Sequence, residues 1–155
     1  MNTAAHELSF TRVLEAPRAK IWRCWTEPAL ILPWFCPKPW RVVEARVDLR
    51  AGGEFYTLMR GPNGEEPSGA PGVFLEVIHE QKLVFTDMFQ PGWVPAGGLN
   101  FVAIVVLADA ASGGTHYTAT ARHWTEAAMK QHEEMGFYGG WNAAADQLEE
   151  FAKTI

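Results

Sequence analysis

Alternating apolar and polar residues predict a chain built mainly from β-strands. The first alternation spans residues 6–14, with Leu8 and Phe10 on one side and Ser9 and Thr11 on the other. Further alternations or apolar runs predict strands over residues 43–49, 55–60, 72–79, 82–89, 99–107 and 115–124, with Gly52-Gly53 at the first turn between them. We therefore expect six or seven antiparallel strands.

Two short helices are expected after the first strand. Ala16-Pro17 starts the first helix, because proline at the first helical position presets the backbone and removes no needed hydrogen bond. Residues 29–32 form the second helix, which ends at Pro33. Because Pro37 and Pro39 exclude a helix over residues 34–40, that segment is predicted to be a rigid aromatic loop.

A long C-terminal helix is expected after Thr125, which can cap it. Its apolar positions recur at steps of three and four, which predicts one face packed on a partner: Phe137, Trp141, Ala144, Leu148 and Phe151. Gly136, Gly139 and Gly140 interrupt this helix, and each costs about 1 kcal/mol relative to alanine. They indicate close packing, a bend or room for another group. The order of elements predicts an α+β fold in which this helix covers one face of an antiparallel sheet.

Composition narrows the class of protein. The 155 residues fit a single domain, expected over residues 6–153, and the 48% of hydrophobic residues exclude intrinsic disorder. A net charge of −5 removes the general attraction to nucleic acid, and no apolar run reaches the ~20 residues of a membrane span. The first residues lack the order of a signal peptide. We expect a cytoplasmic monomer or homodimer that neither binds nucleic acid nor inserts into a membrane.

Several chemistries are excluded by their missing motifs. The segment from His132 begins like a zinc-protease helix, but Gly136 stands where the second histidine is needed. Cys24 and Cys36 are twelve residues apart, which favours two reduced thiols over a zinc pair. The sequence also lacks a phosphate-binding glycine loop and a Gly-x-Ser-x-Gly elbow. We therefore expect no metal and no cofactor.

The seven Trp, nine Phe and three Tyr either fill a core or line a cavity. Trp34-Phe35 and Trp93 lie in predicted loops, where they either close the end of the core or form the rim of a pocket. Asp87 and His123 fall in phase with apolar strand positions and are expected to point toward the covered face. They are either a loop cap and a satisfied histidine, or a pair that orients a polar group.

Nine short motifs, in order along residues 8–151, resemble the homologues of the C-terminal domain of the activator of heat-shock-protein-90 ATPase. They are Ala16-Pro17-Arg18-Ala19-x-Ile21-Trp22, Trp25-Thr26-Glu27-Pro28, Trp34-Phe35-x-Pro37, Asp48-x-Arg50-x-Gly52-Gly53-x-Phe55, Gly61-Pro62-x-Gly64, Gly72-Val73-x-x-Glu76-Val77, Leu83-Val84-Phe85-Thr86-Asp87, Gly114-Thr115 and Met135-Gly136-Phe137-x-x-Gly140-Trp141.

That family lies within the START-like (SRPBCC), helix-grip superfamily. The resemblance implies a curved antiparallel sheet that grips the long C-terminal helix, with an apolar cavity between them. It implies no single activity, because the superfamily includes lipid carriers, cyclases, hydrolases and pure binders.

Three functions stay open. The first is binding of a small, mostly apolar or aromatic molecule, with Trp34-Phe35 at the entrance and a predicted lining of Trp34, Phe35, Phe55, Met59, Phe85, Asp87, Phe101, Tyr117, His123, Phe137 and Trp141. The second is an enzyme of cyclase or hydrolase type, for which Asp87 and His123 are the candidate catalytic pair. The third is a stress-response or co-chaperone-like interaction domain, which predicts a sealed core and an exposed apolar patch.

Overall fold

A computed structural model describes residues 6–69, 71–97 and 101–155. In chain order its elements are β1 (Glu7–Leu14), α1 (Arg18–Thr26), α2 (Pro28–Ile31), β2 (Arg41–Val47), β3 (Glu54–Arg60), β4 (Gly72–Ile78), β5 (Lys82–Thr86), β6 (Phe89–Gln90), β7 (Val94–Pro95), β8 (Phe101–Asp109), β9 (Thr115–His123), α3 (Glu126–Glu134) and α4 (Phe137–Ala152).

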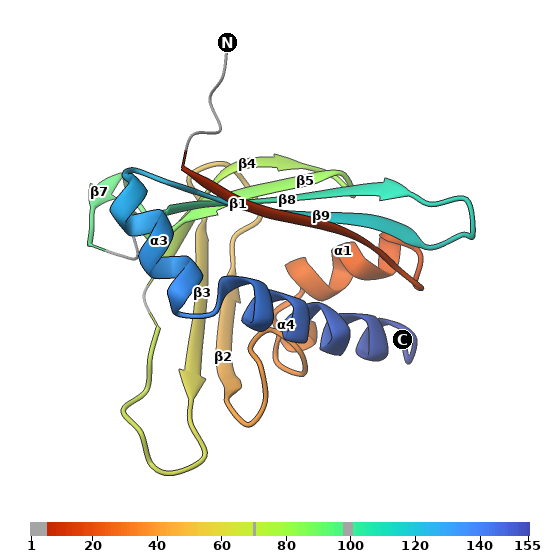
Figure 1. The fold of residues 1–155 in the computed structure, drawn as a ribbon, viewed down its shortest axis with the longest axis horizontal. Helices are drawn as coiled ribbons and strands as arrows, with labels where there is room; N and C mark the ends of the chain where they lie inside the picture. Colours follow the sequence, from red (N-terminus) through yellow and green to blue (C-terminus); the bar gives the residue numbers. More distant parts are fainter. Residues whose placement is uncertain (1–5, 70, 98–100) are drawn as a thin grey trace.

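Seven of the strands form one antiparallel sheet in the order β1-β9-β8-β5-β4-β3-β2. The register shifts between Val42 and Glu44 in β2, and between Phe74 and Glu76 in β4, where irregular pairing bends a strand. The sheet is strongly curved, so that β2 and β3 run steeply away from β1, β8 and β9 (Figure 1). Helix α4 lies across the inside of this curve. The predicted α+β helix-grip architecture is therefore confirmed.

The predicted C-terminal helix is two helices. Thr125 caps α3 as expected, because its Oγ1 accepts a hydrogen bond from the Ala128 amide at 3.0 Å. Gly136 then adopts a left-handed conformation with φ of 101°, which ends α3 and starts α4. The prediction of one continuous helix from Thr125 was wrong at this point, and the bend suggested by the glycines is the correct interpretation of Gly136.

Two short strands were not predicted. β6 and β7 form a separate hairpin, and Gly92 and Trp93 between them both have positive φ. Strands of two residues have no alternation that a sequence could display. The predicted strand over residues 99–107 corresponds to β8, but its predicted start at Leu99 lies outside the described residues.

The second half of α4 packs into the main cluster of buried residues. Ala144, Ala145, Leu148 and Ala152 are buried in one cluster with residues of α1, including Ile21 and Trp25. The small side chains of the three alanines allow α4 to lie close to its neighbours here.

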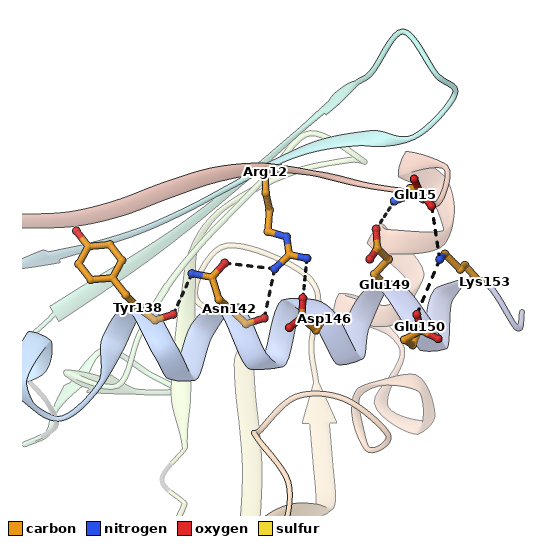
Figure 2. Close-up of polar contacts among 8 residues, drawn as sticks. All are labelled: Arg12, Glu15, Tyr138, Asn142, Asp146, Glu149, Glu150 and Lys153. Atoms are coloured by element: carbon orange, nitrogen blue, oxygen red, sulfur yellow. Dashed lines mark hydrogen bonds and ion pairs between the residues drawn. The ribbon is translucent and has the colours of Figure 1, made fainter.

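Polar contacts on the outer side of α4 hold it to β1 (Figure 2). Arg12 of β1 forms an ion pair with Asp146 at 2.7 Å and donates a hydrogen bond to Asn142 Oδ1 at 3.3 Å. The Glu15 amide donates to the Glu149 carboxylate at 2.7 Å. These contacts run along one side of the helix and set its register against the strand. None of the helices in the described ranges is long and apolar enough to cross a membrane.

Candidate functional site

A cavity of about 540 Å³ lies between the sheet and the first half of α4 and is partly open to solvent. Its walls come from α1, the loop after α2, β3, β4, β5, β8, β9, α3 and α4. The described lining residues are Trp25, Trp34, Phe35, Cys36, Pro37, Phe55, Thr57, Met59, Ser68, Gly69, Gly72, Phe85, Thr86, Asp87, Phe101, Tyr117, His132, Gly140, Trp141 and Ala144. The volume and mostly apolar walls are typical of small-molecule pockets.

Aromatic rings form one wall of the cavity. Trp25 packs edge-to-face against Trp34 and Phe35, with ring centroids 5.0 and 5.6 Å away, and Phe55 packs in the same way against Phe85 at 4.8 Å. Such contacts add to the energy of apolar burial. Trp25 and Trp34 are each only 2% exposed, so their positions are fixed by the core as well as by their neighbours in the wall.

The loop of residues 34–40 is held in place by one side chain of α4. Gln147 Nε2 donates to the carbonyls of Trp34 and Cys36 at 2.9 and 2.8 Å, and its Oε1 accepts from the Lys38 amide at 3.0 Å. Trp34 also donates its indole N–H to the Cys24 carbonyl at 3.1 Å. Because burial raises the pKa of the Cys36 thiol, this lining group is a neutral thiol rather than a nucleophilic thiolate.

Polar groups gather at the end of the cavity where β5 ends and β8 begins. Asp87 follows β5 directly, and Thr86 Oγ1 donates to the Phe101 carbonyl at 2.9 Å. His132 of α3 lies over the same end, with its ring centroid 4.7 Å from that of Phe101. Tyr117 of β9 lies away from this end, opposite Leu107, and its complete burial raises the pKa of its hydroxyl, which keeps that group protonated.

His132 forms a pair with His123, the last residue of β9. His123 Nε2 lies 2.9 Å from His132 Nδ1, and His123 Nδ1 lies 2.9 Å from the backbone carbonyl of His6. The pKa of His132 is lowered to about 4, mainly by burial of the ring and to a smaller extent by the charge interaction with His123. His132 is therefore neutral at physiological pH. Among the described residues, no group of three His, Cys, Asp or Glu side chains is placed to hold a metal ion.

Nine of the predicted pocket residues lie in the cavity wall. They are Trp34, Phe35, Phe55, Met59, Phe85, Asp87, Phe101, Tyr117 and Trp141. His123 and Phe137 do not belong to the described lining: they are 7% and 1% exposed and lie behind it, where Phe137 packs with Leu8 and Ala121. Whether any of these side chains contacts a ligand remains a prediction.

The structure places several of the predicted site residues in particular surroundings. Trp34 is 2% exposed and lies in the inner wall, whereas Phe35 beside it is partly exposed. Asp87 and His123 were expected to act as a pair, but the two ring nitrogens of His123 face the His6 carbonyl and His132. Trp93 is 52% exposed and packs on Phe89, away from this cavity.

His132, Trp25 and Cys36 also line the cavity, although they were not predicted to do so. A signal for His132 was available, because Ala128, Met129 and His132 share the less exposed face of α3 at helical spacing. β9 ends at His123, and Thr125 caps α3 two residues later. The helix therefore begins beside the end of the strand, and its less exposed face, with His132, lies over that end.

The family model of the activator of Hsp90 ATPase homolog 1-like protein matches residues 15–153. No curated protein matches the sequence. Among solved structures, a protein from Nitrosomonas europaea is 44% identical, with 97% of this chain and 96% of that chain covered and a TM-score of 0.91.

More distant structures share the fold. A protein from Rhodobacter sphaeroides is 20% identical, with 96% of this chain and 93% of that chain covered and a TM-score of 0.82. An AHSA1-like protein from Aeromonas hydrophila is 20% identical, with 96% and 92% covered and a TM-score of 0.74. With its family model matched over residues 15–153, the chain belongs to the family of activator of Hsp90 ATPase homolog 1-like proteins.

Proposed function

We propose that this protein binds a small, mostly apolar or aromatic molecule in the cavity between the sheet and α4. The observation that carries the proposal is a cavity of about 540 Å³ whose wall contains Trp25, Phe55, Phe85 and Trp141. A volume of this size lies within the range of about 300–1,000 Å³ that ligand pockets occupy. Rings in such a wall provide apolar contact with few rotatable bonds to order on binding.

The position of the cavity favours ligand binding over an interaction domain with a sealed core. The alternative requires close packing beside the glycines of α4, whereas the cavity reaches Gly140 and Trp141. A β-carbon at Gly140 would meet only Pro37 Cγ, at 4.0 Å. The absence of a side chain at this position therefore contributes directly to the open volume.

Binding can be tested with naphthalene, 2-naphthol, a flavonoid and a medium-chain fatty acid, followed by tryptophan fluorescence and thermal unfolding. Rings from Trp25, Trp34 and Trp141 border the cavity, so an occupant is expected to change the emission and to raise the unfolding temperature. The matched control is Gly140→Leu, which places a side chain in the cavity. Unchanged emission and unfolding temperature across the whole panel would refute the proposal.

A further inference from the structure

We propose that His123 and His132 form a hydrogen-bonded relay that presents an unprotonated Nε2 of His132 to the cavity, where it selects neutral aromatic ligands that carry a hydroxyl group. The inference rests on the proposed binding function and specifies its ligand class. It uses a pair of residues from two elements, the end of β9 and the last turn of α3, that meet at the polar end of the cavity.

The direction of the relay follows from its first acceptor. A backbone carbonyl can only accept a hydrogen bond, so His123 Nδ1, 2.9 Å from the His6 oxygen, carries a proton. In a neutral His123 the other nitrogen, Nε2, is then an acceptor. His132 Nδ1, 2.9 Å from it, must donate. These tautomers are assigned from the hydrogen-bond network.

The surroundings of His123 offer its ring no opposite charge in this chain of bonds. The residue is 7% exposed, and its described hydrogen-bond partners are a carbonyl and a second imidazole, with no carboxylate between them. A buried imidazolium without an opposite charge would be costly. Two cationic rings 5.1 Å apart would add mutual repulsion.

The consequence for His132 is a lone pair on Nε2. His132 is neutral at physiological pH and uses its one proton on Nδ1, so Nε2 is an acceptor. This nitrogen has no hydrogen-bond partner among the described residues, while the ring itself lines the cavity. Phe101 and Phe137 pack on the ring at centroid distances of 4.7 and 5.2 Å and hold its orientation.

The charged residues of the cavity lining determine which ligand group can bind to His132 Nε2. The described lining contains Asp87 but neither Lys nor Arg, and His132 adds no positive charge. A ligand carboxylate would therefore lose its hydration near an acidic side chain without gaining a cationic partner. A phenolic hydroxyl avoids this cost and supplies the proton that His132 Nε2 can accept.

Four probes with nearly the same aromatic body separate these contributions at neutral pH: 2-naphthol, 2-methoxynaphthalene, naphthalene and 2-naphthoate. We expect calorimetry to show 2-naphthol binding about threefold to tenfold more tightly than 2-methoxynaphthalene, the range set by one net hydrogen bond. We expect 2-naphthoate to bind more weakly than 2-naphthol by about tenfold or more.

The variant that isolates the acceptor is His132→Phe, which keeps a ring between Phe101 and Phe137 but removes both nitrogens. It should bind 2-naphthol and 2-methoxynaphthalene equally. The matched control is His116→Phe on the exposed side of the same strand as His123, which should keep the preference. Circular dichroism and thermal unfolding establish that each variant folds.

Nitrogen-15 NMR of the histidine rings provides a readout that a purely structural role would not change. Both His123 and His132 should give the signature of the Nδ1–H tautomer, and 2-naphthol should shift the Nε2 signal of His132. A signature of Nε2–H in His132, equal binding of the hydroxyl and methoxy probes to the unmodified protein, or tightest binding of 2-naphthoate would each overturn the inference while leaving ligand binding intact. If none of the four probes binds, both the inference and the proposed function fail.

Discussion

Gln147 of α4 donates a hydrogen bond to the carbonyl of Cys36 at 2.8 Å, which ties the helix to the loop that forms one wall of the cavity. The same amide group also bonds the backbone of Trp34 and Lys38. A single side chain on α4 thus replaces the regular hydrogen bonding that a loop containing Pro37 and Pro39 cannot make for itself.

Gln147→Ala should therefore loosen the loop. Backbone groups that lose a partner in a partly buried site cost about 1–3 kcal/mol, and we expect a loss of unfolding free energy in that range. We also expect weaker binding of 2-naphthol, because Cys36 and Pro37 line the cavity. Chemical denaturation and calorimetry measure the two effects. Gln131→Ala, on the exposed surface of α3, should change neither.

Substitutions at Gly140 should separate stability from binding. Gly140→Ala adds a β-carbon that meets only Pro37 Cγ at 4.0 Å, and it should stabilise the helix by about 0.5–1 kcal/mol. Gly140→Leu should keep the fold but weaken binding of 2-naphthol by at least about tenfold, since its side chain enters the cavity. Gly139→Ala is the control: its β-carbon meets nothing within 4 Å, so it should add stability and leave binding unchanged. Tight binding by Gly140→Leu would place the ligand elsewhere.

Acid should destabilise the protein through His132. Its pKa is lowered to about 4 in the folded chain, below the ordinary value of 6.5, so the unfolded chain binds a proton first as pH falls. The contribution is fully present above pH 6.5 and is lost between 6.5 and about 4. We expect a loss of about 1 kcal/mol, because the half-exposed ring is partly screened.

An NMR titration of His132 checks this prediction directly, and the same pH series on His132→Phe should lack this part of the loss. Removal of His123 as His123→Phe should raise the pKa of His132, since it takes away the neighbouring imidazole. A pKa of His132 near 6.5 in the unmodified protein would contradict the prediction.

The two sides of α4 should contribute very different amounts of stability. Leu148 is fully buried, and Leu148→Ala should cost about 2–5 kcal/mol through lost burial and a new void. Asp146→Ala removes the ion pair with Arg12 on the outer side, where the Asp146 side chain is 67% exposed, and should cost no more than about 1 kcal/mol (Figure 2). Urea denaturation of the two variants measures both values, and similar costs would contradict the prediction.

The spacing of apolar residues along the sequence was enough to predict the main strands. It also predicted which face of the C-terminal helix packs against the sheet. β1, α1 and α2 follow closely the alternation and the prolines from which they were predicted, and the phase of β9 places Tyr117 and His123 on the covered side. The break at Gly136 was harder to locate, because a glycine within a helix and a glycine that ends one look the same in a sequence. The backbone conformation that distinguishes them depends on how α3 packs on β9.

Lining residues of the cavity could be predicted where they lie on the inner face of a strand, as Phe55 and Phe85 do. The partners of His123 were not, since a sequence shows which face a side chain shares but not which residue of another element lies opposite. His132 belongs to a helix whose position depends on the bend at Gly136. Phe137 shows the same limit, because the first turn of α4 points this ring behind the wall that Trp141 completes.

Helix α4 is packed into the core by Ala144, Ala145, Leu148 and Ala152 in its second half and borders the cavity at Gly140 and Trp141 in its first half. Substitutions near Gly140 and Trp141 therefore alter the shape of the pocket without touching the buried contacts of Ala145 and Leu148. One helix in this way combines a tightly packed end with an end that borders the cavity. The shape of the cavity can therefore be changed at one end of α4 while the contacts that hold the helix in the fold stay intact at the other.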